Sequence, residues 1–173
     1  MSQTKTSVDH HGVFMQVNGH GILIIGQPGI GKSSFALELL HQGQQLIADD
    51  IIEFTQINKQ LIGSCPAMSQ GLLHSRELGL ISVTQLFGND AFNQQHQLDF
   101  VVELKTSLEN TASLSPIKNY EIDGLTFPLL QLSITSPASI YNRLVTWLTM
   151  KTSDGYDAET TLKHRQQQQM NSD

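Results

Sequence analysis

The chain has 173 residues, of which 39% are hydrophobic and 15% are charged, and its formal net charge is −6 at pH 7. This length predicts one domain with a proper hydrophobic core, and an acidic chain without a basic cluster is a poor match for nucleic acid or an anionic membrane. Because the polar start lacks an apolar signal core and no stretch could span a bilayer, we expect a cytoplasmic protein.

The first predicted elements form a β-hairpin. Residues 1–10 are expected to be a flexible arm, and the alternating pattern over 11–17 predicts a strand. Asn18-Gly19 is a strong turn signal, and the apolar run 22–25 predicts a second, buried strand. This second strand leads directly into a glycine-rich segment.

That glycine-rich segment matches the phosphate-loop pattern G-x-x-x-x-G-K-[ST] and lies between the predicted strand and a predicted helix that ends near Gly43. Glycines let successive backbone N–H groups face an anion, and the helix N-terminus adds positive charge. The alternative is a glycine-rich turn that fits the pattern by chance. We expect a nucleotide or polyphosphate to bind at Gly26, Gln27, Pro28, Gly29, Ile30, Gly31, Lys32, Ser33 and Ser34.

Two acids follow the next predicted strand, over residues 45–48, and these are Asp49 and Asp50. The carboxyl ends of neighbouring strands meet at one crevice in an open α/β sheet, which would place the pair beside the phosphates. Adjacent strand residues point to opposite faces, so only one would face the γ-phosphate, as a general base or as a metal ligand through water. The alternative is a solvated turn pair.

The rest of the chain alternates short apolar runs with polar loops. Residues 63–79 are rich in glycine, serine and proline, which is typical of an active-site loop or a subunit contact. The remaining expected elements, in chain order, are a strand over 80–83, a mobile loop over 89–97, a buried strand over 98–104, a polar stretch over 105–120, a hairpin over 120–132 that turns at Asp123-Gly124, a helix over 136–150 beginning near Pro137, and a polar, disordered tail over 161–173.

Several charged residues, histidines and the single cysteine are further candidates for the site, and each also has a simpler explanation. Arg76 could bind phosphate and Glu77 could contact Mg²⁺, although an exposed ion pair is the commoner role for such neighbours. If the first strand lies beside the strand of the phosphate loop, His11 could hydrogen-bond an active-site carboxylate. The other histidines do not have the spacing of zinc ligands with Cys65. Cys65 is the only cysteine, which excludes an intramolecular disulfide and fits a reducing compartment.

Taken together, these motifs resemble the catalytic domain of the HPr kinase/phosphorylase family. The resemblance covers residues 11–160, and the chain looks like a short form that begins at this domain. The segments that carry it are His11-Gly-Val, Gly26 to Ser33, Leu46 to Asp50, Arg76 to Gly88, Leu98 to Leu104 and Gly155 to Glu159.

The resemblance implies an α/β fold, with a P-loop core related to phosphoenolpyruvate carboxykinase and a β-rich mixed sheet with flanking helices. It also implies Mg²⁺-dependent phosphate transfer from ATP or pyrophosphate to a serine of HPr, the reverse attack of phosphate on phosphoserine, and a hexamer. Within the site it makes Asp49 the general base and acid, His11 its support, and Lys32 a ligand of the β- and γ-phosphates. Metal contacts are expected from Ser33, Asp50 and Glu77, and Arg76 belongs to the signature loop.

The chain departs from the family pattern at two places. His74 stands where the signature loop carries a glutamate, and Thr135 and Ala138 stand where a later loop carries arginines. We expect dephosphorylation and partner docking to be the properties most affected. Three functions therefore remain open, namely a serine protein kinase acting on HPr, a small-molecule kinase or nucleotide hydrolase, and a nucleotide-sensing module without catalysis.

Overall fold

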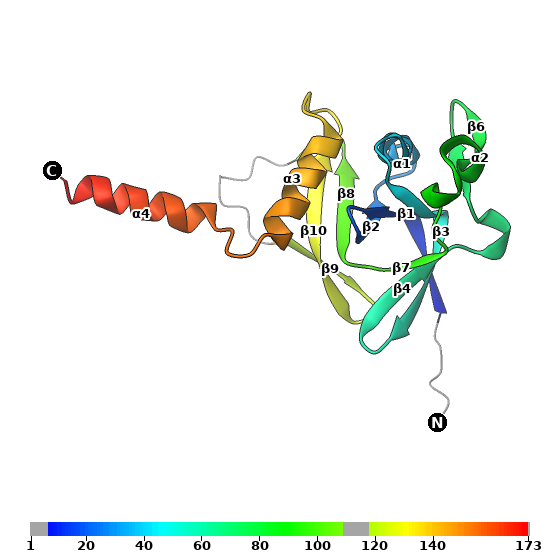
Figure 1. Cartoon of the computed structure of the whole chain (residues 1–173), viewed down its shortest axis with the longest axis horizontal. Helices are drawn as coiled ribbons and strands as arrows, with labels where there is room; N and C mark the ends of the chain where they lie inside the picture. The colour runs from blue at the N-terminus through cyan, green and yellow to red at the C-terminus, as the bar shows by residue number, and fades with distance from the viewer. Residues whose placement is uncertain (1–6, 109–117, 173) are drawn as a thin grey trace.

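A mixed β-sheet supports the phosphate loop, and its strands and helices are coloured in chain order in Figure 1. The computed structural model describes residues 7–108 and 118–172. The strands are β1 (Ser7–Val17), β2 (His20–Ile25), β3 (Gln45–Ile57), β4 (Gln60–Ser64), β5 (Leu72–Ser75), β6 (Gly79–Ser82), β7 (Gln95–Gln97), β8 (Phe100–Lys105), β9 (Lys118–Ile122) and β10 (Leu125–Ser133). The helices are α1 (Lys32–His41), α2 (Val83–Phe87), α3 (Ile140–Thr152) and α4 (Ala158–Met170), with short 3-10 helices η1 (Ala67–Ser69) and η2 (Asn89–Ala91).

The direction of the strands brings several carboxyl ends to one edge of the sheet. The strand order is β7-β4-β3-β1-β2-β8-β10-β9, and β5 and β6 form a separate two-stranded ribbon. β1 is antiparallel to both β2 and β3, so these two neighbours run the same way. β8 is parallel to β2 and to β10. The strands β3, β2, β8 and β10 therefore all end toward the edge where the phosphate loop begins.

Apolar side chains are buried on both faces of this sheet. On one face, α1 and α3 bury an apolar stripe against strand residues such as Val13, Met15 and Ile24. On the other face, Phe14 and Phe54 pack with residues from β4, β9 and β10. Helices cover one face of the sheet, and strands of the curled sheet cover the apolar cluster on the other face. This packing on both faces holds the strand ends at the phosphate loop in place. The expected α/β architecture, a mixed sheet with flanking helices, is confirmed.

Both predicted hairpins form where their turn residues stand. Asn18 and Gly19 have φ of 50° and 83°, and Asp123 and Gly124 have φ of 50° and 78°, as Asn-Gly and Asp-Gly turns between strands require. The predicted helix over 136–150 begins later, at Ile140, because the Ser139 side chain accepts a hydrogen bond from the backbone N–H of Asn142 and caps it.

Two segments are more regular than the sequence suggested. The arm was expected to reach residue 10, but β1 starts at Ser7 and residues 7–10 pair with β3; residues 1–6 lie outside the described part. The expected mobile loop 89–97 contains η2 and the edge strand β7, which pairs with β4. Pairing with a neighbouring strand, which no local pattern reveals, orders both segments. Of the polar stretch 105–120, residues 109–117 also lie outside the described part.

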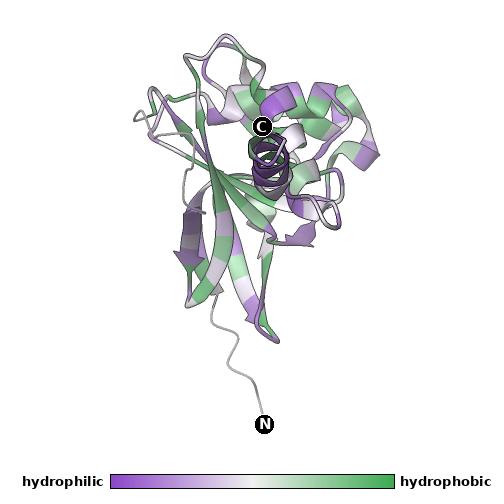
Figure 2. Ribbon diagram, turned by 90° about the vertical axis from the view of Figure 1, so that its left-hand side faces the viewer, coloured by the Kyte–Doolittle hydropathy of each residue, from purple (hydrophilic) through white to green (hydrophobic). Residues whose placement is uncertain are grey.

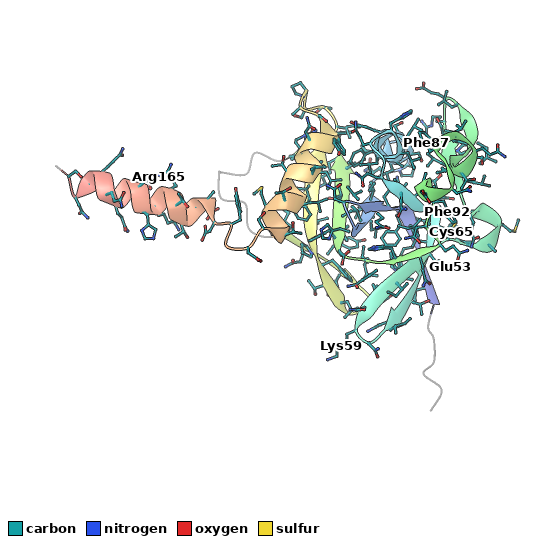
Figure 3. All side chains as sticks on the ribbon, in the orientation of Figure 1. Glu53, Lys59, Cys65, Phe87, Phe92 and Arg165 are labelled. Carbon is teal, nitrogen blue, oxygen red and sulfur yellow. The ribbon has the colours of Figure 1, made fainter. Side chains whose placement is uncertain are left out.

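The polar tail over 161–173 was expected to be disordered, but most of it is helical, because α4 spans Ala158–Met170. The Asp157 side chain caps this helix by accepting a hydrogen bond from the backbone N–H of Thr160 at 2.9 Å, and the glutamines that follow are good helix formers. The expected polarity is found, since α4 buries no residue, is hydrophilic throughout in Figure 2 and projects Arg165 away from the other elements in Figure 3. Among the described residues, no helix has the length and apolar character needed to cross a bilayer.

Candidate active site

The phosphate loop lies between β2 and α1, where the sequence placed it. Gly26 follows the last residue of β2, and α1 begins at Lys32. The loop is closed by a hydrogen bond from the backbone N–H of Ile30 to the carbonyl of Gln27 at 3.1 Å. Gly29 has φ of 79° and Gly31 has φ of 112°, conformations that strain residues with a Cβ. The backbone from Gln27 to Gly29 is exposed, so the loop is open to a ligand.

The Lys32 side chain curls back over the loop. Its Nζ donates hydrogen bonds to the carbonyl oxygens of Gly26 at 2.8 Å and of Gln27 at 3.0 Å. The ammonium group is therefore held above the open backbone of the loop, where it can meet a phosphate oxygen. The next residues of the motif, Ser33 and Ser34, lie in the first turn of α1, with Ser33 half-buried and Ser34 exposed.

Asp49 on β3 faces this loop from two strands away. Val13 of the intervening β1 pairs with Ile24 on one side and with Asp49 on the other, which places Asp49 level with the end of β2. Its Oδ1 accepts a hydrogen bond from the Ser33 hydroxyl at 3.4 Å. Its Oδ2 accepts one from the backbone N–H of His74 at 2.8 Å. The carboxylate thus bridges the phosphate-loop helix and β5.

A β-bulge in β3 turns Asp49 toward the loop. Met15 pairs with Leu46 and Phe14 pairs with Ala48, so Ile47 is an extra residue without a partner. Leu46 packs on the face that carries α1, whereas Ile47 and Ala48 both pack on the opposite face. If the same residues alternated regularly from Leu46, without a bulge, Asp49 would lie on the face opposite Leu46 and point away from Ser33.

Burial raises the pKa of the Asp49 carboxyl, because a charged group loses hydration in the partly closed site. The negative charge of Asp50 raises it further, and the hydrogen bonds from His74 and Ser33 oppose these effects in part. A carboxylate with a raised pKa holds a proton more readily, which is the property required of a general base that must also act as an acid.

His11 and Asp50 form an exposed pair beside the site. Asp50 has φ of 72°, and its Oδ1 lies 3.8 Å from Nδ1 of His11, with exposed side-chain fractions of 82% and 83%. His11 pairs with Ile51 and Asp49 with Val13, so the two residues are diagonal neighbours in the sheet, and the support of Asp49 by His11 stays a prediction. An ion pair this exposed contributes little to stability.

Arg76 lies against the phosphate loop, although it comes from the turn between β5 and β6. A Cβ placed on Gly29 would come within 2.9 Å of the Arg76 guanidinium, so the two groups are in contact. Glu77 follows in the same turn and is exposed. Within the described residues, no hydrogen bond or ion pair joins Glu77 to the phosphate loop or to β3. The turn therefore brings a cation, but not a carboxylate, into contact with the loop.

The three expected metal contacts are not gathered at one point. Asp50 faces His11 and Glu77 is exposed in its turn, so of these residues only Ser33 lies beside the loop-facing carboxylate of Asp49. No cluster of three or more metal-ligating acids, histidines or cysteines occurs in residues 7–108 and 118–172. Two neighbouring oxygens nevertheless fit Mg²⁺, which is usually bound through one or two protein ligands together with phosphates and water.

The residues that depart from the family pattern have structural roles. His74 contacts Asp49 through its backbone, and its side chain is exposed. The Thr135 hydroxyl donates a hydrogen bond to the carbonyl of Thr106 at 2.9 Å, which joins the segments that follow β8 and β10. The Ala138 carbonyl accepts one from the Arg143 guanidinium of α3 at 3.0 Å. Arg143 was not singled out from the sequence, since nothing local marked it.

A cavity of about 400 Å³ opens on the other side of the phosphate loop from Asp49. Gln27 and Ile30 of the loop form one wall, and the end of β8 with the following residues, including Glu103, Lys105 and Thr106, forms the other. No local pattern in the sequence predicts this cavity, because the cavity depends on the pairing of β8 with β2. Cys65, by contrast, is buried as expected, and burial raises the pKa of its thiol to about 11.

The chain is similar in sequence to a known protein family and to several of its curated members. Residues 2–166 match the family described as the HPr Serine kinase C-terminal domain. An HPr kinase/phosphorylase from Cupriavidus metallidurans is 36% identical over 128 residues, covering 73% of this chain and 40% of that protein. One from Burkholderia cenocepacia is 34% identical over 125 residues, with 72% and 39% covered. The chain thus spans about 40% of the length of these curated relatives.

A solved structure agrees over most of the chain. The structure described as the Hpr(Ser) kinase/phosphatase from Coxiella burnetii superposes with a TM-score of 0.76 at 33% sequence identity. The superposition covers 83% of this chain and 97% of that one.

Proposed function

This chain belongs to the HPr serine kinase C-terminal domain family, and from that membership we propose that it transfers the γ-phosphate of ATP to a serine hydroxyl of HPr, a carrier of the sugar phosphotransferase system. The observation that carries the proposal is the position of the Asp49 carboxylate, which accepts a hydrogen bond from Ser33 of the phosphate-loop motif at 3.4 Å. An acid placed there can reach a hydroxyl that attacks the terminal phosphate.

In this proposal, the loop and its cations hold the phosphates. The exposed residues Gln27 and Gly29 offer backbone N–H donors, and Lys32 and Arg76 lie against the same loop from two different elements. Phosphate transfer depends mainly on positioning and on stabilising charge on the phosphate oxygens. Two cations fixed before the substrate arrives would reduce the rearrangement that each transfer requires.

Asp49 acts as the general base. The serine oxygen bonds to the γ-phosphorus while the bond from that phosphorus to the β–γ bridging oxygen breaks, and Asp49 accepts the hydroxyl proton. Its raised pKa lets it keep this proton and return it to the serine oxygen when inorganic phosphate attacks phosphoserine in the reverse direction. His11 would act on Asp49 through Asp50, whose Oδ1 lies 3.8 Å from Nδ1 of His11.

Mg²⁺ would be held by the Ser33 hydroxyl together with phosphate and water oxygens, beside the Asp49 carboxylate that accepts a hydrogen bond from Ser33. When bound, the ion supplies positive charge that offsets the charge developing on the transferred phosphate and its leaving group. Asp50 and Glu77 remain proposed contributors only through bound water, because neither faces the loop.

The proposal extends to assembly and location through the family resemblance. We expect a homo-oligomer, a hexamer by resemblance, in the cytoplasm. The mass in solution from light scattering tests this expectation, and a monomer would contradict it.

A transfer assay tests the function. The purified chain is mixed with Mg²⁺, γ-labelled ATP and HPr from the same organism, alongside the Lys32→Ala and Asp49→Asn variants. We expect label on an HPr serine, lost in both variants, with ATP binding retained in Asp49→Asn. ATP turnover without label on HPr would contradict the protein-kinase proposal and favour a small-molecule acceptor, whereas binding without turnover would favour a sensing module.

A further inference from the structure

The turn between β5 and β6 has no apolar support of its own. Leu73 and Ile81 pair across the ribbon and are buried in the cluster that α1 covers, so the base of the ribbon is fixed. The turn joins the paired residues Ser75 and Gly79, and the three residues between them are exposed. The conformation of this turn therefore comes from local interactions.

Two local features hold the turn. The Ser75 hydroxyl oxygen accepts a hydrogen bond from the backbone N–H of Leu78 at 3.2 Å. This bond closes a ring around the backbone of Arg76 and Glu77, as serine side chains often do in turns. Gly79 has φ of 82°, a left-handed conformation in which the chain enters β6. Within the described residues, no other side-chain hydrogen bond is made inside the turn.

Arg76 reaches the phosphate loop from this turn. A Cβ placed on Gly29 would lie 2.9 Å from Nη2 and 3.2 Å from Nη1 of Arg76, so both terminal nitrogens lie close to the loop backbone. No hydrogen bond or ion pair within the described part of the chain uses the guanidinium, which keeps its donors available to an anion. An arginine side chain has many rotamers, and its direction therefore depends on the backbone from which it projects.

From these observations we infer that Ser75 is a positioning residue, whose hydroxyl fixes the turn so that Arg76 points at a phosphate bound in the loop. Ser75 acts through Arg76 rather than by touching the ligand. An arginine that already points at its anion loses less freedom on binding, which makes binding tighter. The inference rests on the proposed function, because that function makes a polyphosphate the ligand of the loop.

The preceding residue of β5 confines the effect to the turn. His74 pairs with Leu80 across the ribbon, and its backbone N–H donates a hydrogen bond to Asp49 at 2.8 Å. Both contacts are made by the backbone and do not involve the Ser75 hydroxyl. Removing that hydroxyl should therefore loosen Arg76 and leave the contact between the ribbon and Asp49 in place.

A double-mutant cycle on Ser75 and Arg76 tests the inference. Calorimetric dissociation constants for ATP with Mg²⁺ are measured for Ser75→Ala, for Arg76→Ala and for the double variant. We expect Ser75→Ala to weaken ATP binding about three- to tenfold, as the loss of one hydrogen bond does, and to have no effect when Arg76 is already alanine. Ser75→Thr keeps a hydroxyl and should bind ATP like the wild type.

Ser82→Ala is the matched control on the same ribbon. Ser82 pairs with Leu72 at the end away from the turn, and its side chain makes no capping hydrogen bond to α2. This variant should bind ATP with wild-type affinity. Urea unfolding checks that every variant is folded, and we expect midpoints close to wild type because the bond between Ser75 and Leu78 is exposed.

Wild-type ATP affinity in Ser75→Ala would overturn the inference. An equal loss of affinity in the wild-type and Arg76→Ala backgrounds would also overturn it, because the hydroxyl would then act without Arg76. ATP binding by the wild type without transfer to HPr would contradict the kinase proposal alone and leave this cycle measurable. A wild-type chain that does not bind ATP would contradict both.

Discussion

The raised pKa of Asp49 predicts that Asp49→Asn stabilises the fold while it removes catalysis. Asparagine has the same shape, and its amide oxygen can still accept the hydrogen bond from the backbone N–H of His74. The variant no longer buries a negative charge, and it no longer places that charge beside Asp50. Loss of a general base should lower the transfer rate about 10²- to 10⁴-fold.

The sign of the stability effect follows from proton linkage. The folded chain binds the Asp49 proton more tightly than the unfolded chain, whose aspartate has an ordinary pKa of about 3.9. The contribution of Asp49 to wild-type stability is therefore fully present below that value and is lost as pH rises through the raised pKa of the folded state. Asparagine does not titrate, so the stability of the variant relative to wild type should increase across this window and stay constant above it.

Urea unfolding of both proteins over a series of pH values measures this difference directly. We expect the midpoint of Asp49→Asn to move to higher urea concentration than that of wild type as pH rises toward neutral, with similar slopes of the unfolding free energy. Asp99→Asn is not a suitable control, because the Asp99 carboxylate accepts a hydrogen bond from the backbone N–H of Gly21. Glu121→Asn, on an exposed position, is suitable. A midpoint difference that is independent of pH, or that decreases as pH rises, would refute the reasoning.

Three further predictions concern neighbouring features. Arg76→Ala should weaken ATP binding about tenfold or more in calorimetry, because it removes a cation that contacts the loop at Gly29, and unchanged affinity would contradict that role. His11→Asn should change the free energy of unfolding by less than about 1 kcal/mol and should not shift the pH profile of phosphate transfer, since the pair of His11 and Asp50 is exposed. A large shift of the pH profile would show that His11 acts directly on the general base. Gly63→Ala should cost about 3 kcal/mol in urea unfolding, because its Cβ would lie 2.4 Å from the fully buried ring of Phe14, and wild-type stability would show that the ring can move.

Local sequence signals predicted the parts of the site that depend on neighbours in the chain. The phosphate-loop motif and the Asn18-Gly19 turn each specify a backbone conformation over a few residues, and both are found where expected. Asp49, which follows the third predicted strand, also lies near the loop, because the strand directions bring it there.

The parts that the sequence could not predict depend on register between distant strands. Nothing local distinguishes Asp49 from Asp50, and only the pairing with β1 decides which one meets Ser33 and which one meets His11. The cavity at Glu103 likewise exists only because β8 lies beside β2. Side-chain direction and strand order are tertiary properties, so composition and periodicity carry no information about them.

The extra residue in β3 also determines which changes of length this segment can absorb. Deleting Ile47 would leave Ala48 paired with Phe14 and Asp49 paired with Val13, so the strand would alternate regularly and the carboxylate would stay on the face of Ser33. Inserting one residue between Ala48 and Asp49 without a second bulge would instead turn the carboxylate toward the apolar cluster around Phe14 and Phe54. A one-residue insertion here should therefore be far more harmful than loss of the bulge residue itself.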